Sequence, residues 1–303
     1  MCEPQTLYLC EYGTANGGER SLLAWLPHVL AAGYDVRVVA PAEGPLAKLL
    51  QRAGLPILPW PADQEGSANK LADRRSFLAD AIRRQRPSLI HANSLSMSRL
   101  VGPVAAEQGV PSIGHLRDIL RISRQAMCDL NDNTRILAVS QATADWHIAQ
   151  GLAADKTHVL YNGVDLDEFT PHEPTGYLHR ELNLPREARL IGAVGQLGMR
   201  KGLDVLLAAA EEVIPQFPEL HLLLVGERNS AKNEAVKFEQ RLRASAAAPP
   251  LAGRVHFLGY RDDMPQLLNE LTLLVHAARQ EPLGRVLLEA AAEGPMVVTS
   301  LIT

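Results

Sequence analysis

Short apolar segments rich in β-branched residues alternate with amphipathic segments along this 303-residue sequence. This alternation constrains the fold, because parallel strands need a long crossover between them that is usually a helix. We therefore predict an α/β fold of parallel sheets covered by helices. The clearest candidate helices span residues 18–32, 69–84 and 141–150. The candidate strands span residues 6–10, 35–40, 56–60, 88–92, 111–115, 136–140, 158–162, 190–194, 221–225, 254–258, 273–276 and 296–299.

The pattern breaks between residues 162 and 190, where prolines, a glycine and charges accumulate without a long apolar period. The chain is also longer than a typical single domain. We therefore predict two Rossmann-like domains, over residues 1–170 and 171–303. Ligands of such sheets bind at the carboxyl ends of the strands, so a site is expected in the turns that follow the strands.

The charge balance and the cysteines exclude several classes of protein. Thirty basic against 34 acidic residues give a formal charge of −4, so no overall positive field recruits nucleic acid. The three cysteines lack C-x-x-C spacing, which argues against a disulfide framework, a zinc site or a redox pair. No run of about eighteen apolar residues occurs. We expect a cytoplasmic protein, with peripheral contact to the inner face of a membrane as the alternative.

A basic segment at residues 70–86 is the part of the first domain that would make such a membrane contact. On an amphipathic helix its cations form a face that is either solvated or binds an anionic acceptor or membrane surface. A solvated face is the simpler interpretation. The basic residues are Lys70, Arg74, Arg75, Arg83, Arg84 and Arg86.

The turn after the first strand, EYGTANGGERS, contains Gly13, Gly17 and Gly18. Glycine lets backbone N–H groups approach a phosphate, and a helix N-terminus favours negative charge. The spacing matches neither G-x-G-x-x-G nor G-x-x-x-x-G-K-[ST], so a dinucleotide dehydrogenase and a P-loop NTPase lose support. Taken alone, the segment is equally compatible with a structural turn.

A second turn, in AVGQLGMRKGLDVLLAAA, carries Gly195 and then two adjacent cations, Arg200 and Lys201, before a helix. Cations are disfavoured near the positive end of a helix. A diphosphate at this turn would resolve that conflict, because Arg binds it through its planar fork and Lys as a point charge. Two further apolar strands, in LLLVGERNS and VHFLGYRDDM, also end in glycine. Together these turns indicate a nucleotide site at one edge of the second sheet.

The segment RQEPLGRVLLEAAAEG contains two glutamates, Glu281 and Glu289. A helix that begins near Gly284, after Pro282, leaves Glu281 in the preceding loop and places Glu289 about one and a half turns along. Free N–H groups at the helix start can hold a phosphate, and the two carboxylates can accept hydrogen bonds from sugar hydroxyls. A merely solvated Glu289 is the alternative.

Taken in order, the motifs resemble those of the retaining family 4 glycosyltransferases, also called group 1, of the GT-B fold. Each motif is weak, but the ordered set is specific and covers nearly the whole chain. The motifs are GGER, AAGYDVRVVAP, PSLIHANS, PSIGHLRD, ILAVSQAT, VLYNGVDLDEF, VGQLGMRKGLDVLLAAA, LLLVGE, VHFLGYRDDM and the glutamate pair.

The resemblance implies two Rossmann-like domains facing each other across a cleft. The second binds a nucleotide-diphosphate sugar, and the first binds a saccharide, lipid-linked or small-molecule acceptor. The donor is a substrate, and no cofactor is implied. The implied roles are diphosphate binding for Arg200 and Lys201, backbone N–H donation at Gly18 and in the turn before Gly284, ribose binding for Glu289, donor-sugar binding for Glu281, a position near the base for Tyr260, and contact with the transferred sugar for His115.

The chemistry agrees with these roles, since transfer with retention needs a stabilised leaving diphosphate more than a strong base. Fixed donors aimed at developing charge supply about 3 to 4 kcal/mol each. Arg200 and Lys201 are therefore the leading catalytic candidates. His115 alone would otherwise be interpreted as a core histidine, and His91 and Asn93 as residues that shape the acceptor cleft.

A metal site is not predicted. Asp165 and Asp167 form a D-x-D string of the kind that holds a divalent ion on the diphosphate in other sugar transferases. The string lies in the interdomain segment without a histidine partner nearby, so we interpret it as structural.

The chain departs from the family pattern near its end. Gly294 directly precedes Pro295, where family members have an intervening residue, and the sequence stops at MVVTSLIT. We therefore expect an incomplete second domain and infer a truncated coding region, with a break in the reading frame or in the sequence assembly near residues 294–300. Two alternatives to an active transferase stay open: a nucleotide-sugar epimerase of similar fold, and an inactive truncated fragment.

Overall fold

The computed structural model describes residues 3–61, 70–228 and 230–299. The chain forms two compact units, residues 1–162 and 163–303, here called unit 1 and unit 2. The expected boundary after residue 170 was too late, because the buried Phe169 belongs to the core of unit 2. Cys2, the predicted helix start at Asn69 and the end of the inferred frame break at Ser300 lie outside the described residues.

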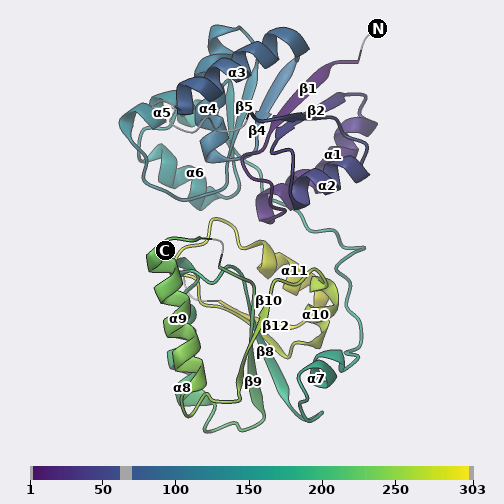
Figure 1. Ribbon diagram of the computed structural model, residues 1–303, viewed down its shortest axis with the longest axis vertical. Coiled ribbons are helices and arrows are strands. Elements are labelled where there is room, and N and C mark those ends of the chain that lie inside the picture. Colours follow the sequence, from purple (N-terminus) through teal and green to yellow (C-terminus); the bar gives the residue numbers. More distant parts are fainter. Residues whose placement is uncertain (1–2, 62–69, 229, 300–303) are drawn as a thin grey trace. The chain divides into compact units, whose positions relative to one another are not determined.

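Unit 1 contains a seven-stranded sheet in the order β3-β2-β1-β4-β5-β6-β7 (Figure 1). All of its pairings are parallel, as predicted. The chain moves outward from β1 to β3 and then returns to place β4 on the other side of β1, so the sheet has a topological switch point between β1 and β4. The strands are β1 Gln5–Leu9, β2 Asp35–Ala40, β3 Ile57–Pro59, β4 Leu89–Ala92, β5 Ser112–Leu116, β6 Arg135–Ala138 and β7 Thr157–Val159.

Helices cover both faces of this sheet, because alternate residues of each strand point to opposite faces. Leu7 and Leu9 of β1 belong to one core, with α3 and α4, whereas Tyr8 belongs to a second core, with α1 and α2. Serine N-caps begin three of the helices by accepting a backbone N–H three residues on. The helices are α1 Gly17–Ala31, α2 Pro45–Arg52, α3 Lys70–Gln85, α4 Leu95–Glu107, α5 Arg124–Asn131 and α6 Gln141–Ile148.

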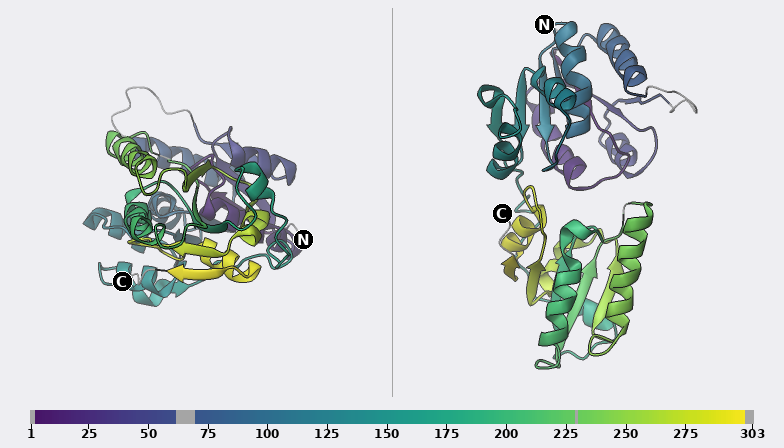
Figure 2. Two further views of the ribbon diagram at one scale, coloured as in Figure 1. Left: turned by 90° about the horizontal axis from the view of Figure 1, so that it is seen from below. Right: turned by 90° about the vertical axis from the view of Figure 1, so that its left-hand side faces the viewer.

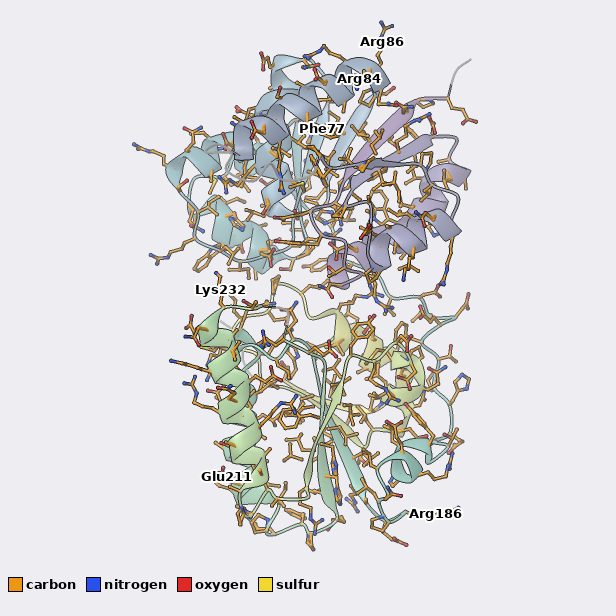
Figure 3. All side chains as sticks on the ribbon, viewed as in Figure 1. Phe77, Arg84, Arg86, Arg186, Glu211 and Lys232 are labelled. Atoms are coloured by element: carbon orange, nitrogen blue, oxygen red, sulfur yellow. The ribbon has the colours of Figure 1, made fainter. Side chains whose placement is uncertain are left out.

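The basic helix α3 uses part of its charge within unit 1. Arg75 lies 2.9 Å from the buried carboxylate of Asp129, and the Arg74 guanidinium lies 5.8 Å from the centre of the Trp60 ring. Arg84 and Arg86, near the end of the helix, are exposed and point away from the ribbon (Figure 3). The side chain of Lys70 lies outside the described part of the chain. The helix therefore combines an ion pair and a cation–π contact within unit 1 with exposed cations at its end.

Unit 2 contains a five-stranded parallel sheet in the order β10-β9-β8-β11-β12, also covered on both faces (Figure 2). Its topological switch point lies between β8 and β11. The strands are β8 Arg189–Val194, β9 Leu220–Val225, β10 Val255–Gly259, β11 Leu273–His276 and β12 Met296–Thr299. The helices are α7 Tyr177–Glu181, α8 Leu203–Val213, α9 Asn233–Ala247, α10 Met264–Glu270 and α11 Arg285–Glu293, with a 3-10 turn at Met199–Lys201.

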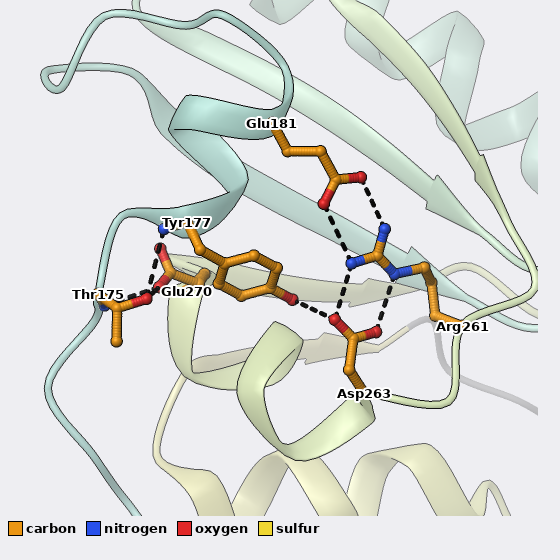
Figure 4. Close-up of polar contacts among 6 residues, drawn as sticks. All are labelled: Thr175, Tyr177, Glu181, Arg261, Asp263 and Glu270. Atoms are coloured by element: carbon orange, nitrogen blue, oxygen red, sulfur yellow. Dashed lines mark hydrogen bonds and ion pairs between the residues drawn. The ribbon is translucent and has the colours of Figure 1, made fainter.

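The segment that enters unit 2 is held by polar contacts as well as by the apolar packing of Phe169 and Leu178 (Figure 4). The buried Glu270 carboxylate accepts hydrogen bonds from the N–H groups of Thr175 and Gly176 and from the Thr175 hydroxyl, at 2.7–2.9 Å. The short helix α7 follows these residues. The sequence shows no helical period here, because the conformation of this segment depends on its hydrogen bonds with Glu270 of α10.

A second set of contacts joins α7 to the turn after β10 (Figure 4). The Tyr177 hydroxyl donates to Asp263 at 2.8 Å, and Arg261 donates to both oxygens of Asp263 at 2.7 and 2.8 Å. Arg261 also binds the Glu181 carboxylate at 2.7 and 3.2 Å. These contacts fix the turn that carries Tyr260.

Candidate active site

The strongest candidate site lies at the switch point of unit 2. The carboxyl ends of β8 and β11 are neighbours there, and parallel α/β sheets bind their ligands at such points. A small pocket opens between the two strand ends. Its lining residues are Ala193, Val194, Gly195, Lys201, Leu203, Val275, His276 and Ala277.

Lys201 and Glu281 form an ion pair beside this pocket. Both side chains are largely buried, at 15% and 11% exposed. His276 Nε2 lies 3.1 Å from the same carboxylate oxygen, Oε2 of Glu281. Burial raises the pKa of Glu281, but the hydrogen bond with His276 and the charge of Lys201 outweigh burial and lower that pKa to about 2. Glu281 is therefore anionic at neutral pH, and the structure brings two of the predicted site residues into contact.

Close backbone approach places Lys201 at the pocket. Gly202 has a φ of 63°, and a Cβ there would lie 2.0 Å from the carbonyl oxygen of Ala277, so the turn after β8 touches the loop after β11. Gly195 has a φ of 148°, and a Cβ there would meet the Lys201 side chain at 3.0 Å. These glycines are required by geometry, because an L side chain rarely adopts such φ values.

Arg200 lies next to this contact on the exposed side of the turn. Its Nη1 donates to the carbonyl oxygen of Gln280 at 3.3 Å. The Arg200 carbonyl in turn accepts the N–H of Arg279 at 2.8 Å. The guanidinium therefore sits at the mouth of the turn, where the sequence predicted a phosphate-binding cation.

Arg279 was not identified from the sequence. Its guanidinium donates to both carboxylate oxygens of Asp204 at 2.8 and 2.7 Å and to the carbonyl oxygen of Met199 at 2.7 Å. The hydrogen bond with Arg279 lowers the pKa of Asp204. Arg279 thus joins the cationic turn to the loop that carries Glu281. The partners are 75 residues apart, so no local sequence pattern could reveal the pair.

The second glutamate lies on α11, as predicted. Gly284 has a φ of 77° and caps the helix, which begins at Arg285. Glu289 Oε1 lies 2.7 Å from Arg285 Nε, one helical turn earlier, and the Glu289 side chain is 12% exposed. The interpretation of Glu289 as a merely solvated residue is therefore wrong. Its predicted role in ribose binding stays a prediction.

Tyr260 follows β10, two strands away from β8 in the sheet order. Its side chain is 55% exposed. Its backbone N–H donates to Glu227 Oε1 at 3.3 Å, and the Glu227 carbonyl accepts the N–H of Leu197 at 3.0 Å. Glu227, at the end of β9, is a further residue of this edge that the sequence did not single out.

In unit 1, the glycine-rich turn forms the start of α1. Asn16 is the N-cap, and its N–H donates to the Glu19 carboxylate at 3.1 Å in a capping box. A Cβ at Gly18 would meet the Arg117 side chain at 3.1 Å, whereas a Cβ at Gly17 would point into open space. A side chain at Gly18 would therefore crowd Arg117, and the phosphate-binding role of Gly17 and Gly18 stays a prediction.

His115 lies on β5 and is 2% exposed. Its Nδ1 lies 3.1 Å from Arg117 Nη2 and 3.3 Å from His91 Nε2. Burial lowers the pKa of His115 well below its usual value, and the charge of Arg117 lowers it further. Burial also lowers the pKa of His91, to about 3. His91 packs against Tyr8 and Trp25 in the core, with ring centres 5.4 and 5.1 Å away.

Two observations concern metals and membranes. Within residues 3–61, 70–228 and 230–299, no group of three or more His, Cys, Asp or Glu side chains is arranged to hold a metal ion. The Asp165 carboxylate accepts the N–H of Asp167 at 2.9 Å, a contact within its own turn. No helix in the described part of the chain is long and apolar enough to cross a membrane.

Comparison with known proteins agrees with the fold. Residues 15–168 match the model of Glycosyltransferase Family 4, and residues 188–303 match a model of glycosyl transferases group 1. A solved structure, HepE from Anabaena in complex with UDP and glucose, has a TM-score of 0.85 and 25% identity, covering 99% of this chain and 81% of that chain.

Curated relatives include a phosphatidyl-myo-inositol mannosyltransferase from Mycolicibacterium smegmatis, 29% identical over 96% of this chain and 75% of the relative. The lipopolysaccharide core mannosyltransferase LpcC from Rhizobium leguminosarum is 34% identical, but over only 47% of this chain and 39% of the relative. These relatives are transferases, so the epimerase alternative is not favoured.

The two parallel α/β sheets and the cationic turn at a strand end define a glycosyltransferase of the GT-B type. Within that class, the two family models account for most of the sequence. The chain belongs to glycosyltransferase family 4.

Proposed function

We propose that this protein transfers a sugar, with retention of configuration and without a metal ion, from a nucleotide-diphosphate sugar to an acceptor hydroxyl. The observation that carries the proposal is the cluster of Lys201, Glu281 and His276 at the switch-point pocket of unit 2. A buried ammonium beside a carboxylate that is anionic at neutral pH is suited to a ligand with both phosphates and hydroxyls.

The leaving diphosphate carries the developing charge in this reaction. Arg200 and Lys201 supply positive charge at the carboxyl end of β8, and preorganised donors of this kind stabilise a transition state by about 3 to 4 kcal/mol each. The Gly284 turn before α11 adds backbone N–H groups at a helix start. The two cations take the role that a divalent ion has elsewhere, which is the basis for proposing a metal-independent reaction.

The remaining roles follow from the positions of the side chains. Glu281 is held anionic and accepts hydrogen bonds from the donor sugar, while Glu289 binds the ribose and Tyr260 lies beside the base. His115 of unit 1 contacts the transferred sugar. The structure of HepE with UDP and glucose supports a uridine nucleotide as the first donor to assay.

The acceptor is a saccharide, a lipid-linked saccharide or a small molecule, bound mainly by unit 1. The names of the two mannosyltransferase relatives support a saccharide or lipid acceptor. The exposed Arg84 of α3 and Arg86, just after that helix, provide a cationic surface for an anionic headgroup, with the protein in the cytoplasm at the inner face of the membrane. Sedimentation with vesicles of phosphatidylglycerol and phosphatidylcholine tests this contact, which the variant R84E/R86E should weaken and charge-neutral vesicles should abolish.

A transfer assay tests the reaction. UDP-glucose and GDP-mannose are incubated with an acceptor panel, and the anomeric configuration of the product is read by NMR. Retained configuration and full activity in EDTA are expected. An inverted product, or activity that EDTA abolishes and Mn²⁺ restores, contradicts the proposal. No nucleotide release, together with no thermal shift for any nucleotide sugar, would instead indicate an inactive fragment.

A further inference from the structure

Arg117, just after β5, binds polar groups from three parts of unit 1. Its Nε donates to the carbonyl oxygen of Asn93 at 3.1 Å, and its Nη2 donates to Asn93 Oδ1 at 2.8 Å. Its Nη1 donates to Asn162 Oδ1 at 3.1 Å. The same Nη2 lies 3.1 Å from His115 Nδ1. Asn93 follows β4 and Asn162 follows β7, so this guanidinium connects three strand ends.

The contact with Arg117 determines which nitrogen of His115 carries the proton. A guanidinium has only donors, so His115 Nδ1 must accept the hydrogen bond from Arg117. A neutral imidazole has one donor and one acceptor, which places its proton on Nε2. His91 Nε2, at 3.3 Å from the same Nδ1, is then also a donor to it. Arg117 therefore sets the tautomer of His115, and the proton on His91 Nε2 follows from it.

The protonated nitrogen of His115 points to an unfilled partner position. Nε2 of His115 is buried and has no hydrogen-bond partner in the described part of the chain. Buried donors in proteins are nearly always paired, so an orphaned one at a strand end indicates a ligand. The backbone of His115 is fixed as well, since its N–H donates to the Ser98 hydroxyl at 3.0 Å.

We propose that Arg117 is a positioning residue that holds His115 as the neutral Nε2–H tautomer, so that Nε2–H donates a hydrogen bond to an oxygen of the transferred sugar. In this state His115 acts as a donor and not as a general base. The identification of the ligand as a sugar rests on the proposed function. The assignment of the tautomer depends only on the contact with Arg117.

The electrostatics around the imidazole agree with this assignment. The groups whose charges act on it are Arg117, after β5, and His91, on β4. Burial and the Arg117 charge keep the pKa of His115 far below its usual value, so the ring stays neutral at physiological pH. The cation that orients the ring therefore also prevents its protonation.

The first experiment measures the tautomer without any sugar. In protein labelled with ¹⁵N-histidine, long-range ¹H–¹⁵N correlations should show His115 with a protonated Nε2 and a bare Nδ1. Arg117→Met should produce a tautomer mixture and raise the pKa of His115, whereas Arg117→Lys, which retains a donor, should restore the Nε2–H form. Asn162→Ala is the matched control, since it removes another Arg117 contact but leaves the one to His115. An unchanged tautomer and an unchanged pKa of His115 in Arg117→Met refute the positioning role.

The second experiment tests the donor role and uses UDP-glucose and GDP-mannose as probes. His115→Gln retains an N–H near the position of Nε2, whereas His115→Asn does not reach it. We expect kcat of the Asn variant to be about tenfold lower than kcat of the Gln variant, because one hydrogen bond typically contributes about that factor. Equal losses in the two variants would overturn the donor role. If wild-type protein transfers no sugar while the tautomer result holds, the proposed function fails and the positioning role stands.

Discussion

The ion pair at Glu281 predicts how the stability of unit 2 depends on pH. Glu281→Gln keeps the size of the side chain but removes its charge. In the wild type the folded pKa of Glu281 is about 2, against an ordinary value of 4.5. A carboxylate whose pKa is lowered by folding stabilises the protein above the unfolded pKa, and that stabilisation is lost as the pH falls toward the folded pKa. The loss therefore occurs between about pH 4.5 and pH 2.

The magnitude follows from the same two values. A difference of about 2.5 pKa units corresponds to about 3 kcal/mol of stabilisation at neutral pH. Roughly 1.5 kcal/mol of this is lost between pH 6 and pH 3.5. The stability difference between wild type and Glu281→Gln should shrink by that amount over this interval. Only the pH dependence is diagnostic, because the glutamine also weakens the contacts with Lys201 and His276.

Urea unfolding at a series of pH values measures the effect. The three tryptophans, Trp25, Trp60 and Trp146, all lie in unit 1, so their fluorescence follows that unit, and far-UV circular dichroism is needed to follow unit 2. Glu211→Gln is the control, because Glu211 is exposed on α8 of the same unit (Figure 3). If the difference in unfolding free energy between wild type and Glu281→Gln stays the same from pH 6 to pH 3.5, Glu281 is not a buried carboxylate paired with positive charge.

Three further predictions concern the cationic turn. Lys201→Ala should lower kcat about 100- to 1,000-fold while circular dichroism shows an intact fold, and unchanged turnover would remove Lys201 from the reaction. Arg279→Met and Asp204→Asn should each lower kcat. Because the two residues act as one pair, kcat of the double variant should be no lower than that of the worse single variant. Additive losses of kcat would argue for independent roles. Gly202→Ala should destabilise unit 2 by at least about 1–3 kcal/mol in urea unfolding, since it adds a Cβ at a positive φ against the Ala277 carbonyl; wild-type stability would contradict that close approach.

The strands were predictable from the sequence because each is a short apolar run with both faces buried. Every predicted strand is present, with ends displaced by a few residues at most. Helix α7 was not predicted, because it has five residues and the residues just before it are held by Glu270, which lies 94 residues after Gly176. The domain boundary was misplaced for a related reason: Phe169 lies in a segment rich in turn residues, yet packs into the core of unit 2.

The candidate site divides in the same way. Arg200 and Lys201 were singled out because cations at a helix start are locally unusual, and Glu281 because it precedes a helix and forms with Glu289 a pair that resembles the family pattern. Their roles stay predictions. Arg279 and Arg117 were missed, since Asp204 and Asn162, to which they donate, are distant in sequence and an arginine in a loop carries no signal by itself. Residues that touch a ligand can leave a local pattern, whereas residues that hold them in place are revealed only by the fold.

The close backbone approaches in unit 2 have a consequence for redesign. A Cβ at Gly202 would collide with Ala277, and one at Gly226 would lie 2.1 Å from the Gly195 carbonyl, so the turns after β8, β9 and β11 fit together without room for side chains at these positions. A library aimed at a new donor gains little from varying these glycines. The Tyr260 side chain, which is exposed after β10, can instead be varied without adding a Cβ at any of these backbone contacts, so a library should begin there.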